Sequence, residues 1–237
     1  LKAFEEVKPN LILTVPLILE KIYKKMILPQ LSKTTMKVAL NIPLLDSRIY
    51  AQIRKKLVDA FGGRFREVIV GGAAMNEEVT NFLYKIKFPF TIGYGMTECG
   101  PLISYDHNDE YVPGSCGQIL KGIMKVRIDS EDPYNKVGEI QVSGENVMKG
   151  YYKNEEATSK VFTEDGWLRT GDLGTIDADN RIYIRGRSKT MILGASGQNI
   201  YPEEIESKLN NLPFVMESII IEKNGKLVGL VYPDYDT

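Results

Sequence analysis

The chain has 237 residues, of which 43% are hydrophobic and 26% are charged, a globular composition with enough length for one large or two small cores. Its 30 basic and 31 acidic residues are mixed along the sequence and give a net charge of −1, which indicates no nucleic-acid partner. Two cysteines, Cys99 and Cys116, are too few for a disulfide framework, and no apolar run is long enough to span a membrane, so we expect a cytoplasmic protein.

A helix is predicted to begin at Pro16, in the stretch PLILEKIYKKMI. Proline suits the first turn of a helix, where its missing N–H would have no intrahelical partner. The large aliphatic side chains of this stretch are expected to fall close to one face: Leu17, Ile18, Ile22 and Met26.

A second helix is predicted to follow, with Asp46 or Ser47 as its cap. Its apolar residues recur at four-residue spacing: Ile49, Ile53, Leu57 and Phe61. Gly62 and Gly63 are expected to end this helix, because glycine readily adopts the left-handed conformation found after helices.

Two short apolar strands are predicted next, at Val68 to Val70 and Phe90 to Ile92, with a helix capped by Asn76 between them. Helices that alternate with short strands favour a mostly parallel sheet with helices on its faces. We therefore expect an α/β fold in which residues 1–100 are part of an N-terminal domain.

The pattern changes after Pro101, where strand-sized segments are separated by turn signals and no helical period is evident. We expect residues 101–187 to form a β-rich subdomain, a distorted barrel, of the same N-terminal domain. Residues 188–237 predict a helix opened by Pro202 and a hairpin that turns at Asn224-Gly225. A helix and two strands bury little surface, so we interpret this last segment as a truncated small α+β domain.

Glycines and polar residues follow both predicted parallel strands, in GGAAM and in TIGYGMTECGPL. Loops at the carboxyl ends of such strands are where open α/β sheets bind ligands. Tyr94 offers a ring for stacking, Thr97 a hydroxyl for phosphate, and Glu98 a carboxylate that suits Mg²⁺ directly or through water. The alternative is that the glycines only make turns and that Glu98 is a solvated loop acid.

A second polar cluster is predicted further along the chain. Asp172, read as part of a tight Thr-Gly-Asp turn, has two acceptor oxygens that suit the hydroxyls of a ribose. Arg187 can bind ribose or phosphate oxygens, and Lys189 lies where the β-rich part ends. A turn aspartate and a pair of solvated cations are the alternative interpretations.

The motifs YGMTE, TGD and GRSK…GQNIYPEEIE, in this order and at these separations, resemble the adenylate-forming (AMP-binding) superfamily. With GGAAM and VPGSCGQ the resemblance covers nearly the whole chain. Within the superfamily, stretches such as KPNLILTVPLILEKIYKK and GENVMKGYYKNEEATSKVFTEDGWLRTGD are most similar to long-chain fatty acid CoA ligases.

The resemblance implies a two-step reaction of lipid metabolism: a fatty acid attacks the α-phosphate of ATP·Mg²⁺, and coenzyme A then displaces AMP from the acyl-AMP. It also implies roles for residues of this chain. The adenine and the neighbouring part of the nucleotide would be bound by Gly72, Ala73, Tyr94 and Gly95. Thr97 would contact phosphate, Glu98 would serve the magnesium ion, and Asp172 and Arg187 would hold the ribose. Lys189 would be the hinge about which the small C-terminal domain rotates.

Two parts of this family's machinery have no match in the chain: the phosphate loop with its lysine, expected before Leu1, and the lysine that acts in adenylation, expected beyond Thr237. We therefore expect the 237-residue piece to be inactive in adenylation by itself. Alternatives are an enzyme that activates an aryl or amino acid, and a non-catalytic scaffold that binds nucleotide. Acyl chain length and oligomeric state do not follow from the sequence.

Three further features are interpreted more simply. His107, the single histidine, is interpreted as a surface residue and not as a metal ligand. Cys99 is interpreted as a small packing residue. The cations Lys21, Lys24 and Lys25 are interpreted as a solvated helix face, because they are few for stable membrane binding; weak peripheral contact with an acidic membrane is the alternative.

Overall fold

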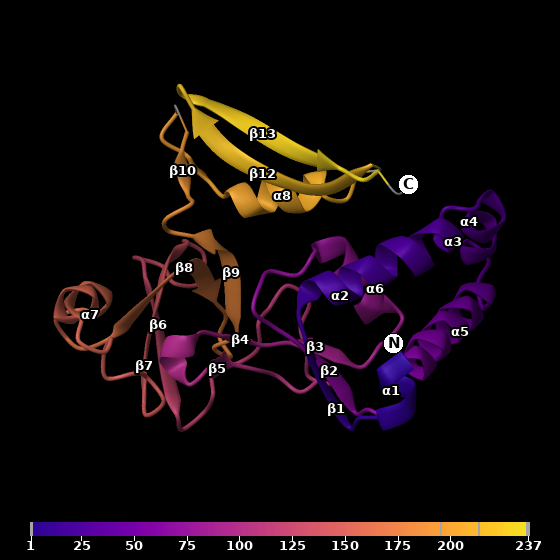
Figure 1. The fold of residues 1–237 in the computed structure, drawn as a ribbon, viewed down its shortest axis with the longest axis horizontal. Coiled ribbons are helices and arrows are strands. Elements are labelled where there is room, and N and C mark those ends of the chain that lie inside the picture. Colours follow the sequence, from indigo (N-terminus) through magenta and orange to yellow (C-terminus); the bar gives the residue numbers. More distant parts are fainter. Residues whose placement is uncertain (1, 195, 213, 236–237) are drawn as a thin grey trace. The chain divides into compact units, whose positions relative to one another are not determined.

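The computed structural model describes residues 2–194, 196–212 and 214–235 (Figure 1). The chain divides into two compact units. Unit 1 comprises Leu1–Gly95 and Tyr105–Gly117, and unit 2 comprises Met96–Ser104 and Gln118–Thr237.

Unit 1 is built on a three-stranded parallel sheet in the order β1 (Leu11–Thr14), β2 (Glu67–Val70) and β3 (Phe90–Ile92). The central strand is the most buried, and Val68 and Val70 are fully buried in the core, as expected for a strand covered on both faces. The predicted parallel sheet is confirmed. Strand β1 was not predicted from the sequence.

Helices make the crossovers that parallel strands require. Those of unit 1 are α1 (Lys2–Val7), α2 (Pro16–Ile22), the π-helix Tyr23–Ile27, α3 (Leu28–Leu31), α4 (Thr34–Leu40), α5 (Leu45–Ala60) and α6 (Glu77–Lys85). The predicted Asn76 cap of α6 is confirmed, since its side chain accepts hydrogen bonds from the backbone N–H groups of Glu78 and Val79.

The helix opened by Pro16 is confirmed, but of the four aliphatic side chains expected on one face only Ile22 packs against the core. Leu17, Ile18 and Met26 are exposed, and the buried side chains are Leu19, Tyr23 and Ile27. The tyrosine decides the orientation of the helix: its ring packs on Phe82 at 5.2 Å, and its hydroxyl donates to Glu78 at 2.8 Å. A count of aliphatic residues alone misses this anchor.

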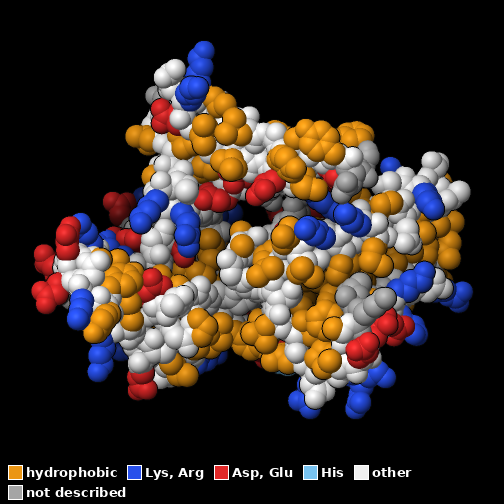
Figure 2. Space-filling view, viewed as in Figure 1, with side chains coloured by type: hydrophobic (Ala, Val, Ile, Leu, Met, Phe, Trp, Pro, Cys, Tyr) orange, Lys and Arg blue, Asp and Glu red, His pale blue; other side chains and the backbone are white. Residues whose placement is uncertain are grey.

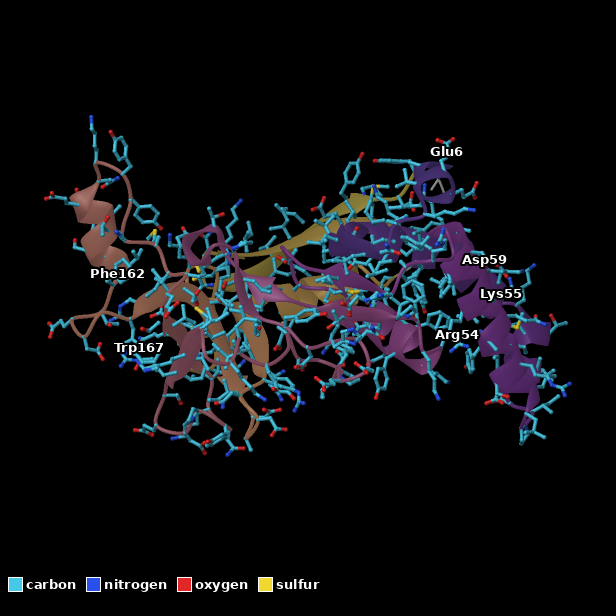
Figure 3. All side chains as sticks on the ribbon, turned by 90° about the horizontal axis from the view of Figure 1, so that it is seen from below. Glu6, Arg54, Lys55, Asp59, Phe162 and Trp167 are labelled. Atoms are coloured by element: carbon cyan, nitrogen blue, oxygen red, sulfur yellow. The ribbon has the colours of Figure 1, made fainter. Side chains whose placement is uncertain are left out.

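Helix α5 has the predicted buried face, on which Leu57 and Phe61 are the most buried. The predicted cap is wrong: the N-cap is Leu44, and Asp46 lies in the first turn, where its carboxylate accepts from the N–H of Ser47. Figure 3 shows Arg54, Lys55 and Asp59 on this helix, and Lys55 pairs with Asp59 at 2.6 Å.

Unit 2 contains a four-stranded antiparallel sheet in the order β6 (Met124–Asp129), β7 (Gly138–Gly144), β8 (Leu168–Ile176) and β9 (Ile182–Arg187). The predicted β-rich character of this region is confirmed. Shorter elements of unit 2 are the 3₁₀ helix Thr97–Cys99, β5 (Leu102–Ser104), β10 (Ile192–Leu193) and β11 (Asn199–Ile200), whereas β4 (Tyr94–Gly95) belongs to unit 1.

The β-rich region also contains a helix that the sequence did not predict, α7 (Glu155–Val161). No residue of α7 is buried, so no apolar period marks it. Its signal is at its start, where Asn154 caps the helix by accepting from the N–H of Ala157 at 3.0 Å. Phe162 and Trp167 mark the link from α7 to β8 (Figure 3), and the Trp167 ring lies 4.6 Å from the guanidinium of Arg127.

The last segment has the predicted helix and hairpin: α8 (Pro202–Leu209), β12 (Val215–Lys223) and β13 (Lys226–Pro233). Helix α8 covers one face of the hairpin, where Ile220 is buried (Figure 1). Hydrophobic side chains remain exposed on the hairpin, among them Ile219, Leu230 and Tyr232 (Figure 2). Across the described residues, no helix is long and apolar enough to cross a membrane.

Candidate functional site

In unit 1, the predicted ligand loops lie at the carboxyl ends of β2 and β3. The N–H of Gly71 donates to Thr14 and the N–H of Gly93 donates to Val70, so both loops leave the sheet side by side. A Cβ added to Gly71 would lie 3.3 Å from the carbonyl oxygen of Gly93. Glycine therefore allows the two backbones to approach closely here.

The predicted nucleotide-binding residues of unit 1 differ in exposure. Gly72 has a φ of +86°, which favours glycine, and it is exposed together with Ala73. Gly95 is exposed as well, whereas Tyr94 is buried. A flat ligand can reach the backbone of Gly72 and Ala73. The adenine-binding roles of these residues stay predictions.

In unit 2, Glu98 is fixed by two hydrogen bonds. The hydroxyl of Tyr151 donates to its Oε1 at 2.9 Å, and the N–H of Met148 donates to its carbonyl oxygen at 2.7 Å. Glu98 is half-buried, and Thr97 beside it is exposed. The hydrogen bond to Glu98 also raises the pKa of the Tyr151 hydroxyl, which is therefore a donor at neutral pH.

Cys99 is fully buried, and this supports its interpretation as a packing residue. Burial, and next the charge of Glu98, raises the pKa of the thiol to about 11, so the thiol is neutral at physiological pH. The amide of Asn146 donates to the carbonyl oxygens of Cys99 and Leu102, at 2.6 and 2.9 Å. Asn146 thus joins the end of the 3₁₀ helix to the start of β5.

Asp172 and Arg187 are brought together by the sheet of unit 2. They are partners in the register of β8 and β9, and the Arg187 Nε donates to the Asp172 Oδ1 at 3.0 Å. The predicted tight Thr-Gly-Asp turn is wrong, because Asp172 lies within β8. Gly171 has a φ of +75° and lies where the register between β7 and β8 shifts. Such an irregularity within a strand uses a glycine, as a turn does, and the sequence alone does not distinguish the two.

Lys189 is exposed in the loop after β9. On one side, the N–H and the hydroxyl of Ser188 donate to the carbonyl oxygen of Gly171 in β8. On the other side, the hydroxyl of Thr190 donates to Glu203 in α8 at 2.6 Å. The residues that flank Lys189 are thus anchored to two different elements.

The side chains around Glu98 supply few ligands for a magnesium ion. Within residues 2–194, 196–212 and 214–235, no group of three His, Cys, Asp or Glu side chains could hold a metal by itself. Mg²⁺ needs only one or two carboxylates when phosphate oxygens and water supply its other ligands. The carboxylate of Glu98, with the Thr97 hydroxyl beside it, fits an ion that arrives with a nucleotide.

His107 belongs to a separate cluster in unit 1. Its Nδ1 lies 2.6 Å from Asp109 and its Nε2 lies 3.9 Å from the buried carboxylate of Glu67. The hydroxyl of Tyr105 and the side-chain amide of Asn108 also donate to Glu67. This cluster anchors the 105–117 loop to the start of β2. His107 is itself exposed, in agreement with its interpretation as a surface residue.

Sequence reasoning missed Tyr151 and Asn146. Both lie in the stretch GENVMKGYY, which was used only for its resemblance to known proteins. The signal available in the sequence was the glycine followed by two adjacent tyrosines, Gly150, Tyr151 and Tyr152. Nothing in the sequence showed that this stretch contacts Glu98.

Open parallel sheets bind ligands in the loops at the carboxyl ends of their strands, and an arginine guanidinium suits phosphate oxygens. The comparison with protein families agrees. The chain belongs to the AMP-binding enzyme family, whose model matches residues 1–152.

The chain is similar to several known proteins. It is 28% identical to long-chain-fatty-acid–CoA ligase 1 of Saccharomyces cerevisiae over 98% of this chain and 36% of that protein. It is 34% identical to 4-coumarate–CoA ligase 1 of Glycine max over 68% of this chain and 58% of that protein. The crystal structure of ATP-bound MatB from Rhodopseudomonas palustris matches 100% of this chain and 43% of its own, with 27% identity and a TM-score of 0.73. The chain spans less than two thirds of each of these proteins.

Proposed function

We propose that the protein to which this chain belongs activates a carboxylic acid with ATP and transfers the acyl group to coenzyme A. The observation that carries the proposal is the pairing of Asp172 with Arg187 across β8 and β9. The pair leaves the terminal Nη groups of Arg187 without an ion pair or hydrogen bond to any described residue, and that side chain is 69% exposed. Such a fork suits ribose or phosphate oxygens.

The proposed reaction has two displacements. A carboxylate oxygen attacks the α-phosphorus of ATP, and the bond from that phosphorus to the bridging oxygen breaks, which releases pyrophosphate. The coenzyme A thiol, after losing its proton, then attacks the acyl carbon, and AMP leaves with the oxygen that came from the acid. A bound Mg²⁺ would neutralise phosphate charge. The residues of this chain bind and align the nucleotide, with Glu98 toward the metal and Asp172 toward the ribose.

We propose a long-chain fatty acid as the substrate. The resemblance of the N-terminal and GENVMKGYY stretches to fatty acid ligases supports this, as does the yeast relative, whose similarity extends over 98% of the chain. An aryl acid is the second candidate, because the 4-coumarate ligase of Glycine max is more identical, at 34%, over a shorter part.

We propose further that Lys189 is a hinge between residues 1–187 and 188–237. The exposed Lys189 lies between Ser188, which is bonded to β8, and Thr190, which is bonded to α8. A change in the backbone dihedrals of one residue between two anchored neighbours would move α8 and its hairpin as a body.

The test uses the complete protein, ATP, Mg²⁺ and coenzyme A, and measures AMP formation with fatty acids of increasing length, 4-coumarate, benzoate and a set of amino acids. Fastest turnover with long fatty acids supports the proposal. Turnover with 4-coumarate alone would support the proposed reaction but contradict the long-chain fatty acid as its substrate. Nucleotide binding without AMP formation from any acid would favour a non-catalytic scaffold.

A further inference from the structure

We propose that Tyr151 is a positioning residue that orients the carboxylate of Glu98 toward a nucleotide-bound Mg²⁺; this rests on the proposed function. Tyr151 donates its hydroxyl hydrogen to the Oε1 of Glu98 at 2.9 Å. The Oε2 of Glu98 accepts no hydrogen bond from any residue that the structure describes. One oxygen is thus held and the other is left for a ligand.

The hydrogen bond to Oε1 fixes the direction in which the Oε2 of Glu98 points. Hydrogen bonds from neighbouring groups fix the rotation of a metal-binding side chain and strengthen its interaction with the ion. The same stretch also holds the backbone of Glu98, because the N–H of Met148 donates to its carbonyl oxygen at 2.7 Å. Main chain and side chain of Glu98 are therefore both fixed by residues 148–151.

Tyr151 is itself held by helix α7. Its N–H donates to the hydroxyl oxygen of Thr158 at 2.9 Å, and that hydroxyl donates to the carbonyl oxygen of Asn154 at 2.8 Å. Asn154 is also the cap of α7. A chain of hydrogen bonds therefore runs from the first turn of α7 through Thr158 and Tyr151 to Glu98.

Gly150 makes this approach possible. Its φ is +151°, and a Cβ at this position would lie 2.7 Å from the Thr158 side chain. The adjacent Tyr152 is 88% exposed, and its hydroxyl makes no hydrogen bond to a described residue. The neighbouring tyrosines therefore form a matched pair in which only Tyr151 contacts Glu98.

The test compares Tyr151→Phe and Tyr152→Phe in the complete protein. Calorimetry measures the binding of α,β-methylene-ATP with and without Mg²⁺; a methylene group replaces the oxygen between its α- and β-phosphorus, so it cannot transfer its adenylate to an acid. We expect Y151F to weaken binding in the presence of Mg²⁺ by about 10- to 100-fold and to leave metal-free binding unchanged, whereas Y152F changes neither. Equal affinities of Y151F and Y152F in Mg²⁺ would overturn the inference. Failure of the unmodified protein to bind the analogue would instead contradict the proposed function.

A second pair of variants tests the connection to α7. Thr158→Val keeps the shape of the side chain and removes its hydroxyl, and Thr158→Ser keeps the hydroxyl. We expect T158V to weaken Mg²⁺-dependent binding, as Y151F does, and T158S to bind like the unmodified protein. Melting temperatures of both variants check that they are folded. If Y151F weakens nucleotide binding equally with and without Mg²⁺, Tyr151 has a general structural role. That result would contradict its proposed role in orienting Glu98 toward the metal.

Discussion

Arg187 and Asp172 form an ion pair in which one partner is buried and the other faces solvent. The side chain of Asp172 is 8% exposed and that of Arg187 is 69% exposed, with 3.0 Å between Nε and Oδ1. The sheet fixes the carboxylate, because Asp172 and Arg187 are cross-strand partners in β8 and β9. The guanidinium is aligned at Nε and presents its other nitrogens outward.

The first prediction concerns this pair. Replacing Arg187 by alanine in the complete protein should weaken nucleotide binding by about 10- to 100-fold, which corresponds to one charge-assisted hydrogen bond. Arg185→Ala is the control, since Arg185 lies on the same strand and, among the described residues, its one ion pair is with Glu204 at 3.9 Å. Equal effects of the two substitutions on AMP affinity would remove Arg187 from the site.

The second prediction compares two glycines of the 105–117 loop. Gly114 and Gly117 both have a positive φ, +83° and +81°, but a Cβ on Gly117 would lie 2.5 Å from the backbone N of Asp106, whereas one on Gly114 meets nothing within 4 Å. Gly114→Ala should lower the free energy of unfolding by about 1 kcal/mol through backbone strain. Gly117→Ala should cost about 1–3 kcal/mol more through overlap. Urea unfolding measures both, and equal losses would show that the loop relaxes around residue 117.

The third prediction concerns pH and His107. The hydrogen bond to Asp109, and next the charge of Glu67, raises the pKa of His107 above its usual 6.5. Protonated His107 therefore stabilises the fold fully below the pKa of the unfolded chain, and this contribution is lost as pH rises through the higher folded pKa.

Melting temperatures of the unmodified protein and of His107→Gln should differ most below about pH 6.5 and converge as the pH rises above that value. The carboxylates facing His107 are Glu67 and Asp109, with Glu110 nearby. Parallel pH curves for the two proteins would contradict a stabilising role for the charged imidazole.

The fourth prediction concerns the two thiols. Cys99 is fully buried, and Cys116 is half-buried. Iodoacetamide should therefore modify Cys116 first in the native protein, while Cys99 should react only after denaturation. Mass spectrometry of peptides from native and denatured samples gives the order, and early labelling of Cys99 would show that the 3₁₀ helix at residues 97–99 opens readily.

The parallel sheet of unit 1 could be predicted because its signals are local. Val68 to Val70 is a short apolar run followed by glycines, and Asn76 is a capping residue before two acids. The orientation of α2 could not be predicted, because it depends on the contact of Tyr23 with Phe82 and Glu78, which lie more than fifty residues away. Helix α7 has no buried face and therefore no periodicity to detect.

The candidate site was predicted in part. Asp172 and Arg187 were identified by type and motif, but their pairing depends on the register of β8 and β9, which the sequence does not show. Tyr151 was missed for the same reason: it lies 53 residues from Glu98 along the chain. Contacts between distant residues are what the structure adds.

The most direct test of the central claim follows the oxygen of the acid. The complete protein is given ATP, Mg²⁺, coenzyme A and the best fatty acid substrate with its carboxylate labelled by ¹⁸O. If the carboxylate attacks the α-phosphorus and AMP is the leaving group, mass spectrometry will find one labelled oxygen in AMP and none in pyrophosphate. Acyl-CoA formed with unlabelled AMP would contradict the acyl-adenylate, and with it the roles proposed for Glu98, Asp172 and Arg187.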